Sequence, residues 1–205
     1  MSGQAKTISD EQLQTFLERI VSESKNVLRD YAIVLFSFKA GLRAGEIAKL
    51  EWRDVIDATG KIGQKIGQED DGSPVHGFTV PAKAAKKGHT RTIPFHPALM
   101  VTLIELRKHK FGSAIPKGPI IEGAMGGRIS PDALRQYVQR LYREHGLDCT
   151  SHSGRRTMIT KMARAANSVD CSLRDVQMIA GHKYIDTTER YVEASANVGK
   201  LVRMI

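Results

Sequence analysis

Apolar residues recur at helical spacing near the start of the chain. Four of them follow a Ser9–Gln12 capping-box pattern and share one helix face: Leu13, Phe16, Leu17 and Ile20. The apolar stretch from Val27 to Ala40 predicts a second helix that stops at Gly41, a usual helix terminator. A short helix is expected over residues 43–50, with Ile47 and Leu50 turned inward and Trp52 packed behind them.

The pattern changes over residues 54–94. Turn-forming residues at 57–60 and 70–74 separate short stretches that contain β-branched side chains. Thr90 to Ile93 leads into Pro94, a common strand exit. We therefore expect a small antiparallel sheet with a lysine-rich hairpin turn at Lys86-Lys87-Gly88.

Helical spacing returns at Pro97, which opens a helix to about His109 with three leucines on one side: Leu99, Leu103 and Leu106. Ser130 caps another helix, which runs to about Glu144. Further helices are expected over residues 154–166, 172–180, 186–193 and 196–204. The predicted fold class is mainly α with a small antiparallel β-sheet (α+β), as one domain over residues 1–205.

The only feature of the composition that points to a class of partner is its charge. Thirty-one Lys and Arg against 22 Asp and Glu give a net charge of +9, which attracts polyanions such as DNA, although a basic helical domain without a specific partner has the same balance. The longest apolar run, Tyr31 to Phe38, is too short to span a bilayer. Cys149 and Cys171 lack the spacing of a zinc site or disulfide framework. We expect a soluble cytoplasmic protein without a metal or cofactor.

Four segments carry chemically useful side chains: residues 41–46, 86–94, 152–155 and 181–191. Each alone has an ordinary structural interpretation. An arginine after a helix is usually solvated, a lone histidine is usually structural, and a tyrosine in a terminal helix usually fills core. Taken together, the four segments supply the groups that attack on a phosphodiester requires.

That attack builds negative charge on the non-bridging phosphate oxygens. Arg43 and Arg155 could clamp these oxygens, since guanidinium groups stay charged at any working pH. A phenol with an ordinary pKa of about 10 is a weak nucleophile at neutral pH, so Tyr191 would need a base such as His152. A hairpin lysine could protonate the departing 5′ oxygen, and His182 could donate a hydrogen bond to the phosphate.

The order and spacing of these segments resemble the tyrosine recombinases, or phage-type integrases, over residues 9–195. Gly41-Leu42-Arg43, followed by Glu46, Ile47, Leu50, Trp52 and Asp54, is similar to the family's first arginine box. His152-x-x-Arg155 is similar to its second box. Ile179 to His182, followed by Thr187, Thr188 and Tyr191, is similar to the segment that carries the later histidine and the nucleophile.

The resemblance implies a site-specific recombinase or integrase that needs neither metal nor ATP. Its catalytic residues would be Arg43, Lys86, His152, Arg155, His182 and Tyr191. Tyr191 would form a 3′-phosphotyrosyl link and leave a free 5′-hydroxyl, and a hydroxyl of a partner strand would reseal the DNA. Glu46 would support Arg43, and further DNA contacts are expected at Lys83, Lys87, Arg91 and Arg156. The implied partners are double-stranded DNA and further copies of the chain, which would form a tetramer. The implied location is the cytoplasm near the nucleoid, in a prokaryotic or phage system.

The chain departs from the family pattern in several places. Arg156 stands where relatives often carry histidine, and extra residues lie around 57–80 and 167–172. Many members carry a helical N-terminal domain, whereas fewer than ten residues precede the first predicted helix here, so we expect either an isolated catalytic domain or a natural single-domain member. In relatives the hairpin lysine lies eight residues before the strand-ending proline, so the resemblance implies that Lys86, eight residues before Pro94, is the general acid, with Lys83 and Lys87 as competitors. The apolar tail at 196–205 is expected to dock on its own domain or on a neighbour.

Two other functions remain open at this point. A DNA-binding module that has lost catalysis could regulate recombination, and a type IB topoisomerase shares the same chemistry but relaxes supercoils. The recombinase hypothesis requires folding to bring Arg43, His152, Arg155, His182 and the Tyr191 phenol around one phosphorus atom.

Overall fold

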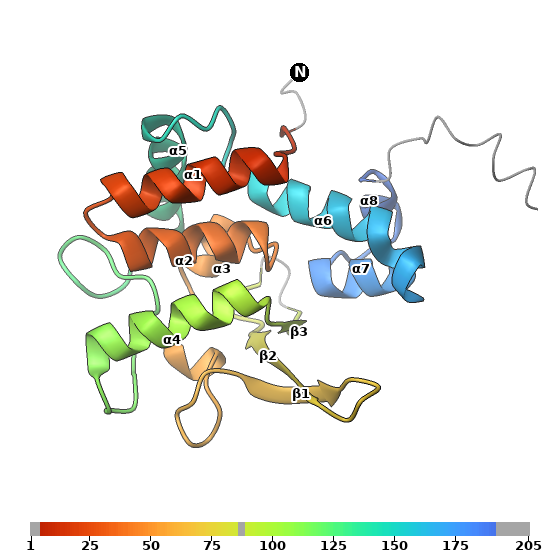
Figure 1. Cartoon of the computed structure of the whole chain (residues 1–205), viewed down its shortest axis with the longest axis horizontal. Helices are drawn as coiled ribbons and strands as arrows, with labels where there is room; N and C mark the ends of the chain where they lie inside the picture. Colours follow the sequence, from red (N-terminus) through yellow and green to blue (C-terminus); the bar gives the residue numbers. More distant parts are fainter. Residues whose placement is uncertain (1–4, 86–88, 192–205) are drawn as a thin grey trace, which may run out of the picture.

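The computed structural model describes residues 5–85 and 89–191, which form a mainly helical fold with one small sheet (Figure 1). The first helices and a 3-10 turn are α1 (Asp10–Glu23), α2 (Val27–Phe38), α3 (Ala44–Ile47) and η1 (Trp52–Asp54). The strands are β1 (Gln64–Gln68), β2 (Pro74–Val80) and β3 (Arg91–Pro94). The later elements are α4 (Pro97–Phe111), α5 (Pro131–Glu144), α6 (Ser153–Ala165), η2 (Ala166–Val169), α7 (Leu173–Ala180) and α8 (Asp186–Glu189). The predicted α+β class is confirmed.

The N-terminal capping box forms as predicted. Ser9 Oγ accepts a hydrogen bond from the Gln12 backbone N–H at 3.1 Å, and Gln12 Oε1 accepts one from the Ser9 N–H at 3.0 Å. The four apolar residues after it are all buried in α1: Leu13, Phe16, Leu17 and Ile20. Helix α2 contacts α1, α4 and α6, so it forms the centre of the molecule.

Two early helices are shorter than the pattern predicted. Helix α2 ends at Phe38 instead of Ala40, and Gly41 then turns the chain with a left-handed φ of +64°. Helix α3 covers only 44–47 of the expected 43–50, yet Ile47, Leu50 and Trp52 are buried as predicted. The early stop of α2 places Gly41 and Arg43 at the edge of the main core.

The sheet has the order β1-β2-β3 and is antiparallel throughout. Phe78 pairs with Ile93, both are buried, and the Phe78 ring meets Phe36 of α2 edge-on at 5.9 Å. The extra residues around 57–80 form β1 and β2, with a bulge between Lys65 and Gly67. The predicted hairpin turn at 86–88 lies outside the described residues.

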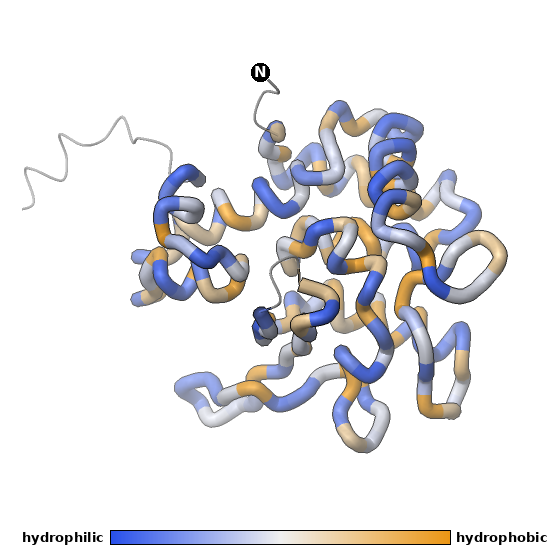
Figure 2. Tube along the Cα trace, turned by 180° about the vertical axis from the view of Figure 1, so that it is seen from behind, coloured by the Kyte–Doolittle hydropathy of each residue, from blue (hydrophilic) through white to orange (hydrophobic). Residues whose placement is uncertain are grey.

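Buried apolar residues form two clusters. The main core joins α1 to α5 and the sheet, and the C-terminal cluster consists of Met158, Ile159, Ala166, Val176 and Ala180. Figure 1 shows α6, α7 and α8 together on one side of the molecule. Figure 2 shows hydrophilic and hydrophobic residues mixed along the helices, as one-sided burial requires.

The last described segment differs in detail from expectation. Helix α8 covers only 186–189 of the predicted 186–193, and Tyr191 lies in the turn after it. Asp170, among the extra residues near 167–172, has a left-handed φ of +53° at the end of η2, a conformation that glycine adopts more readily. The helix and docking tail predicted beyond 195 lie outside the described residues. Over residues 5–85 and 89–191, every helix is too short or too polar to cross a membrane.

Candidate active site

A basic cleft of about 760 Å³ gathers residues from distant parts of the chain. Four of the predicted catalytic residues line it: Arg43, His152, Arg155 and Tyr191. Its cationic side chains are Lys6, Arg43, Arg135, Arg155, Arg156 and Arg190, against one carboxylate, Asp148. The excess of cations makes this cleft suited to a polyanion.

Arg155 occupies the first turn of α6 and is only 4% exposed. Its Nη1 donates to the Gly41 carbonyl at 2.6 Å, and its Nη2 donates to the Ala180 carbonyl at 2.7 Å and to His182 Nε2 at 2.9 Å. The guanidinium therefore ties the segment after α2 to the end of α7. Among the described residues, three of its five N–H groups have a hydrogen-bond partner, so the other two are available to a ligand in the cleft.

The charge of Arg155 survives this burial. Burial lowers its pKa first, repulsion from Arg43 lowers it further, and the resulting value is about 9. That pKa is above neutrality, so the guanidinium stays protonated at physiological pH. The start of α6 lies this deep because residue 154 is glycine: a Cβ there would lie 2.9 Å from a ring carbon of Phe38 in α2.

Arg43 precedes α3 and is held by Glu46. The Glu46 carboxylate accepts hydrogen bonds from the Arg43 N–H at 3.0 Å and from Arg43 Nη1 at 3.2 Å. Burial acts to raise the pKa of Glu46, but hydrogen bonds and charge from Arg91, and then Arg43, outweigh it and lower that pKa. Glu46 is thus an ionised buried carboxylate, while the Arg43 side chain keeps 24% of its surface exposed in the cleft.

His182 lies behind Arg155 and is 8% exposed. A guanidinium can only donate, so the 2.9 Å contact from Arg155 makes His182 Nε2 the acceptor. The ring proton is then on Nδ1, which donates to Thr188 Oγ1 at 2.9 Å. In this arrangement His182 orients Arg155, and the hydrogen bond to phosphate that the sequence suggested would require a change in the ring's contacts. Thr188 belongs to the motif matched in the sequence, but its position there did not indicate that it would contact His182.

Tyr191 is half-buried between two other site residues. Its ring stacks on the His182 imidazole with centroids 5.6 Å apart, and the Arg156 guanidinium carbon lies 5.6 Å from the same ring. Arg156, expected to contact DNA, therefore lies in the basic cleft beside Tyr191.

His152 is the exposed N-cap residue of α6 and lines the cleft. The half-buried Cys149 also lines it, but burial raises the pKa of this thiol to about 12. Cys149 is therefore protonated at neutral pH and is a weak nucleophile. The candidate nucleophiles among the described residues of the cleft are then the Tyr191 phenol and the aliphatic hydroxyl groups.

The predicted basic residues of the sheet fall in different places. Lys83 is 47% exposed and forms an ion pair with Glu51 at 3.2 Å, away from the lining of the cleft. Lys86 and Lys87 lie outside the described residues. Arg91 does not reach the surface as a DNA contact would, because its side chain is 7% exposed and paired with Glu46 at 2.9 Å. Sequence reasoning also missed Lys6, Arg135 and Arg190, which join the cleft only through folding.

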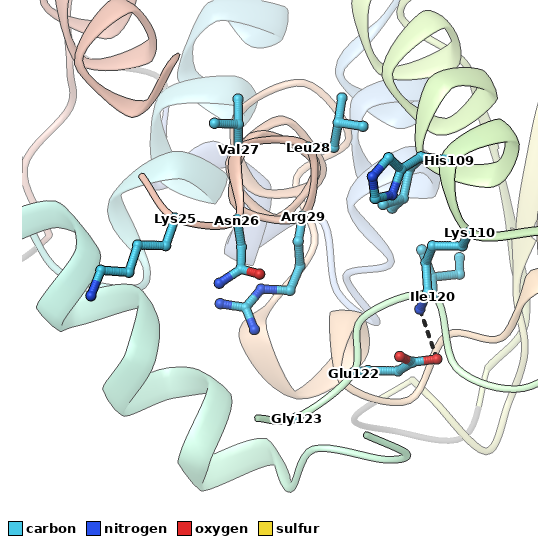
Figure 3. Close-up of a pocket in the computed structure, with 11 residues that line it drawn as sticks. Lys25, Asn26, Val27, Leu28, Arg29, His109, Lys110, Ile120, Glu122 and Gly123 are labelled. Atoms are coloured by element: carbon cyan, nitrogen blue, oxygen red, sulfur yellow. Dashed lines mark ion pairs between the residues drawn. The ribbon is translucent and has the colours of Figure 1, made fainter. Parts of the chain in front are cut away.

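A second hollow, of about 390 Å³, lies between the start of α2 and the end of α4 (Figure 3). An ion pair of 2.7 Å joins Lys110 to Glu122 at its edge. None of the predicted catalytic residues lines this hollow. Within residues 5–85 and 89–191, no three His, Cys, Asp or Glu side chains form a group that could hold a metal ion.

Comparisons with known proteins agree with the motif order. The sequence matches the family described as the phage integrase family over residues 6–197. It is 29% identical over 178 residues to the tyrosine recombinase XerC of Bifidobacterium longum strain DJO10A, which covers 86% of this chain and 46% of that protein. The chain thus spans about half the length of this relative.

Solved structures share the fold. The Tn1549 transposon integrase in complex with transposon right end DNA has a TM-score of 0.70 at 17% identity, covering 99% of this chain and 66% of that one. The XerA recombinase crystal structure has a TM-score of 0.67 at 17% identity, covering 100% of this chain and 64% of that one. At this level of identity, the likeness concerns the fold alone.

Proposed function

This chain belongs to the phage integrase family, and on that premise we propose that it acts as a site-specific DNA recombinase. The observation that carries the proposal is the shared cleft, in which Arg43, His152, Arg155 and Tyr191 come together. His182 joins the group through its contacts with Arg155 and Tyr191. Double-stranded DNA is the proposed substrate, since the cleft is cationic and DNA is a polyanion.

In the proposed first step, the Tyr191 oxygen attacks the phosphorus of one strand. The bond from phosphorus to the 5′ oxygen breaks as the bond to the tyrosine oxygen forms, which leaves a 3′-phosphotyrosyl link. Arg43 and the two unused N–H groups of Arg155 bind the non-bridging oxygens. These cations stabilise the charge that develops in the transition state.

Two proton transfers complete that step. His152, exposed at the cleft, accepts the phenolic proton. The departing 5′ oxygen takes a proton from a lysine of the segment between β2 and β3, for which Lys86 is the proposed residue, with Lys83 and Lys87 as alternatives. A 5′-hydroxyl of a partner strand then attacks the phosphotyrosyl link and releases Tyr191. The link conserves the bond energy, so this scheme requires no ATP. Because Arg43 and Arg155 stabilise the charge on the phosphate oxygens, it requires no metal ion either.

The proposal extends to the organisation of the reaction. Strand exchange between two DNA sites requires several copies of the chain, which we place in a tetramer with the tail at 196–205 docked on a neighbour. Residues 1–205 would act as a single catalytic domain, in the cytoplasm near the nucleoid.

The decisive experiment uses a nicked suicide DNA substrate. Wild-type protein is expected to form a denaturant-resistant protein–DNA adduct, whereas Tyr191→Phe should bind the same DNA without forming one. Tyr184→Phe is the matched control, since this tyrosine is 58% exposed outside the basic cleft and should retain adduct formation.

Other outcomes identify the competing functions. Wild-type binding without any adduct would indicate a DNA-binding regulator that lacks catalysis. Relaxation of supercoiled plasmid without site preference would indicate a type IB topoisomerase.

A further inference from the structure

We infer that Arg91 is a positioning residue that keeps Arg43 available to phosphate and fixes the segment before His182. The inference rests on the proposed function, because it assigns Arg91 a part in the same reaction. Arg91 is the first residue of β3, and its side chain is buried between α3 and α7.

Three hydrogen bonds connect Arg91 to these two helices. Its Nη1 and Nη2 donate to the two carboxylate oxygens of Glu46 at 3.0 and 2.9 Å, a bidentate geometry. Its Nε donates to the Ile179 carbonyl in α7 at 3.1 Å. A single planar guanidinium therefore links the sheet, the Arg43 box and the end of α7.

The backbone before His182 is shaped around this side chain. Gly181 has a left-handed φ of +66°, which L side chains rarely adopt. A Cβ at Gly181 would also lie 2.9 Å from Arg91 Cδ and 3.2 Å from its Nε. Glycine at position 181 thus permits both the left-handed turn before His182 and the close packing of the Arg91 side chain against that turn.

Charge gives Arg91 its effect on Arg43. Glu46 is 1% exposed and accepts hydrogen bonds from both arginines. Without Arg91, the buried carboxylate would depend on Arg43 alone and would draw that guanidinium inward. With Arg91 neutralising Glu46, the positive charge of Arg43 remains available in the cleft.

Arg91→Met and Arg91→Lys test the inference in single-turnover adduct formation. Arg91→Met is expected to slow the reaction by up to about 100-fold, the size of effect that misplacement by 1 Å can have, with DNA affinity retained. Lysine keeps the charge but cannot form the bidentate pair and reach Ile179 together, so Arg91→Lys should be intermediate. Arg53→Met, which removes a 69% exposed arginine paired with Glu51, is the control and should react like wild type.

A double variant separates neutralisation from mere support of the fold. If Arg91 acts by neutralising Glu46, then Arg91→Met with Glu46→Gln should recover part of the rate lost in Arg91→Met. A double variant as slow as Arg91→Met, or slower, overturns this mechanism.

Hydrogen exchange tests the physical link without relying on activity. Arg91→Met, and to a smaller degree Arg91→Lys, should accelerate backbone exchange in both 43–47 and 178–183. Unchanged exchange in either segment overturns the link. If wild-type protein forms no adduct, the proposed function fails while this exchange result still decides whether Arg91 joins the two segments.

Discussion

The main core and the C-terminal cluster are stabilised in different ways. The main core packs apolar residues from five helices and the sheet, whereas the C-terminal cluster has five buried hydrophobic residues. Polar contacts supplement this small cluster: Arg155 reaches the Ala180 carbonyl, and Arg91 reaches the Ile179 carbonyl. Both contacts fall at the end of α7, where cationic groups are favourable.

The difference explains where the candidate site lies. Arg43 belongs to the edge of the main core, while His182 and Tyr191 belong to the C-terminal side. Arg155 spans the boundary, with one hydrogen bond to each region's backbone. The geometry of the site therefore depends on how firmly the C-terminal cluster, which relies partly on hydrogen bonds, is held against the larger main core.

Matched core substitutions test this comparison most directly. Ile33 in α2 and Ile159 in α6 are both 0% exposed. Ile33→Ala should lower the free energy of global unfolding by about 2–5 kcal/mol, because it leaves a cavity in the main core. Ile159→Ala should mainly accelerate hydrogen exchange over 173–189, with a smaller loss of global stability in denaturant. Equal losses of global stability in the two variants, with hydrogen exchange accelerated uniformly along the chain, would contradict the division between the main core and the C-terminal cluster.

Substitution of the two arginines sharpens the comparison. Arg43→Ala and Arg155→Ala should each slow adduct formation by about 10²–10³-fold, since each removes a donor to the transition state. Only Arg155→Ala should also lower the melting temperature substantially, because the Gly41 and Ala180 carbonyls lose their donor at about 1–3 kcal/mol for each unsatisfied group. Kinetics and thermal unfolding measure both effects; equal melting temperatures would contradict the role of Arg155 at the boundary.

Lowering the pH tests how the buried Glu46 carboxylate, at the edge of the main core, contributes to stability. The pKa of Glu46 is lowered below its ordinary value of 4.5, so its stabilising effect is present above that value and is lost as pH falls through the lower, folded-state pKa. Glu46→Gln should be less stable at neutral pH but should lose less stability than wild type as the pH falls from neutral to below 4.5. Thermal unfolding across this range measures the slope, and parallel curves for the two proteins would contradict the assignment.

Salt dependence gives the smallest expected effect. Six cationic residues line the basic cleft, so a plot of log affinity against log salt should be steep, and Arg135→Ala should reduce its slope by about one. Arg140→Ala provides the control, because Arg140 lies on the same helix α5 but does not line that cleft. Binding titrations from about 50 to 200 mM salt measure both slopes. Equal reductions of the slope in Arg135→Ala and Arg140→Ala would show that α5 contributes only overall positive charge, not a specific contact in the cleft.

Local signals in the sequence predicted most of the fold. The capping box at Ser9 and Gln12 and the inward leucines of α4 depend on residues three to four apart, so their pattern is visible in the sequence. Helix ends were less predictable: α8 stops at Glu189, and Asp170 takes a left-handed conformation that glycine adopts more readily. Those choices depend on tertiary contacts that spacing does not encode.

The candidate site was predictable as a set of residues but not as an arrangement. The boxes around Arg43, Arg155 and Tyr191 stand out because their chemistry and order are specific. Arg91 was predicted as a surface contact, since one cationic side chain looks like another until its partner is known. Its burial depends on Glu46, 45 residues earlier in the chain, and on the absence of a side chain at Gly181.

The hydrogen bonds of Arg155 to two neutral carbonyls also determine the electrostatics of the cleft. Carbonyl oxygens orient the guanidinium without cancelling its charge, while Arg43 repels it, Glu46 attracts it and Arg91 repels it. Like charges therefore lie close together where the two regions meet, and Glu46 offsets only part of their repulsion. A bound phosphate group would offset the remaining repulsion, so a polyanion in the cleft would also help to hold the small region against the large one.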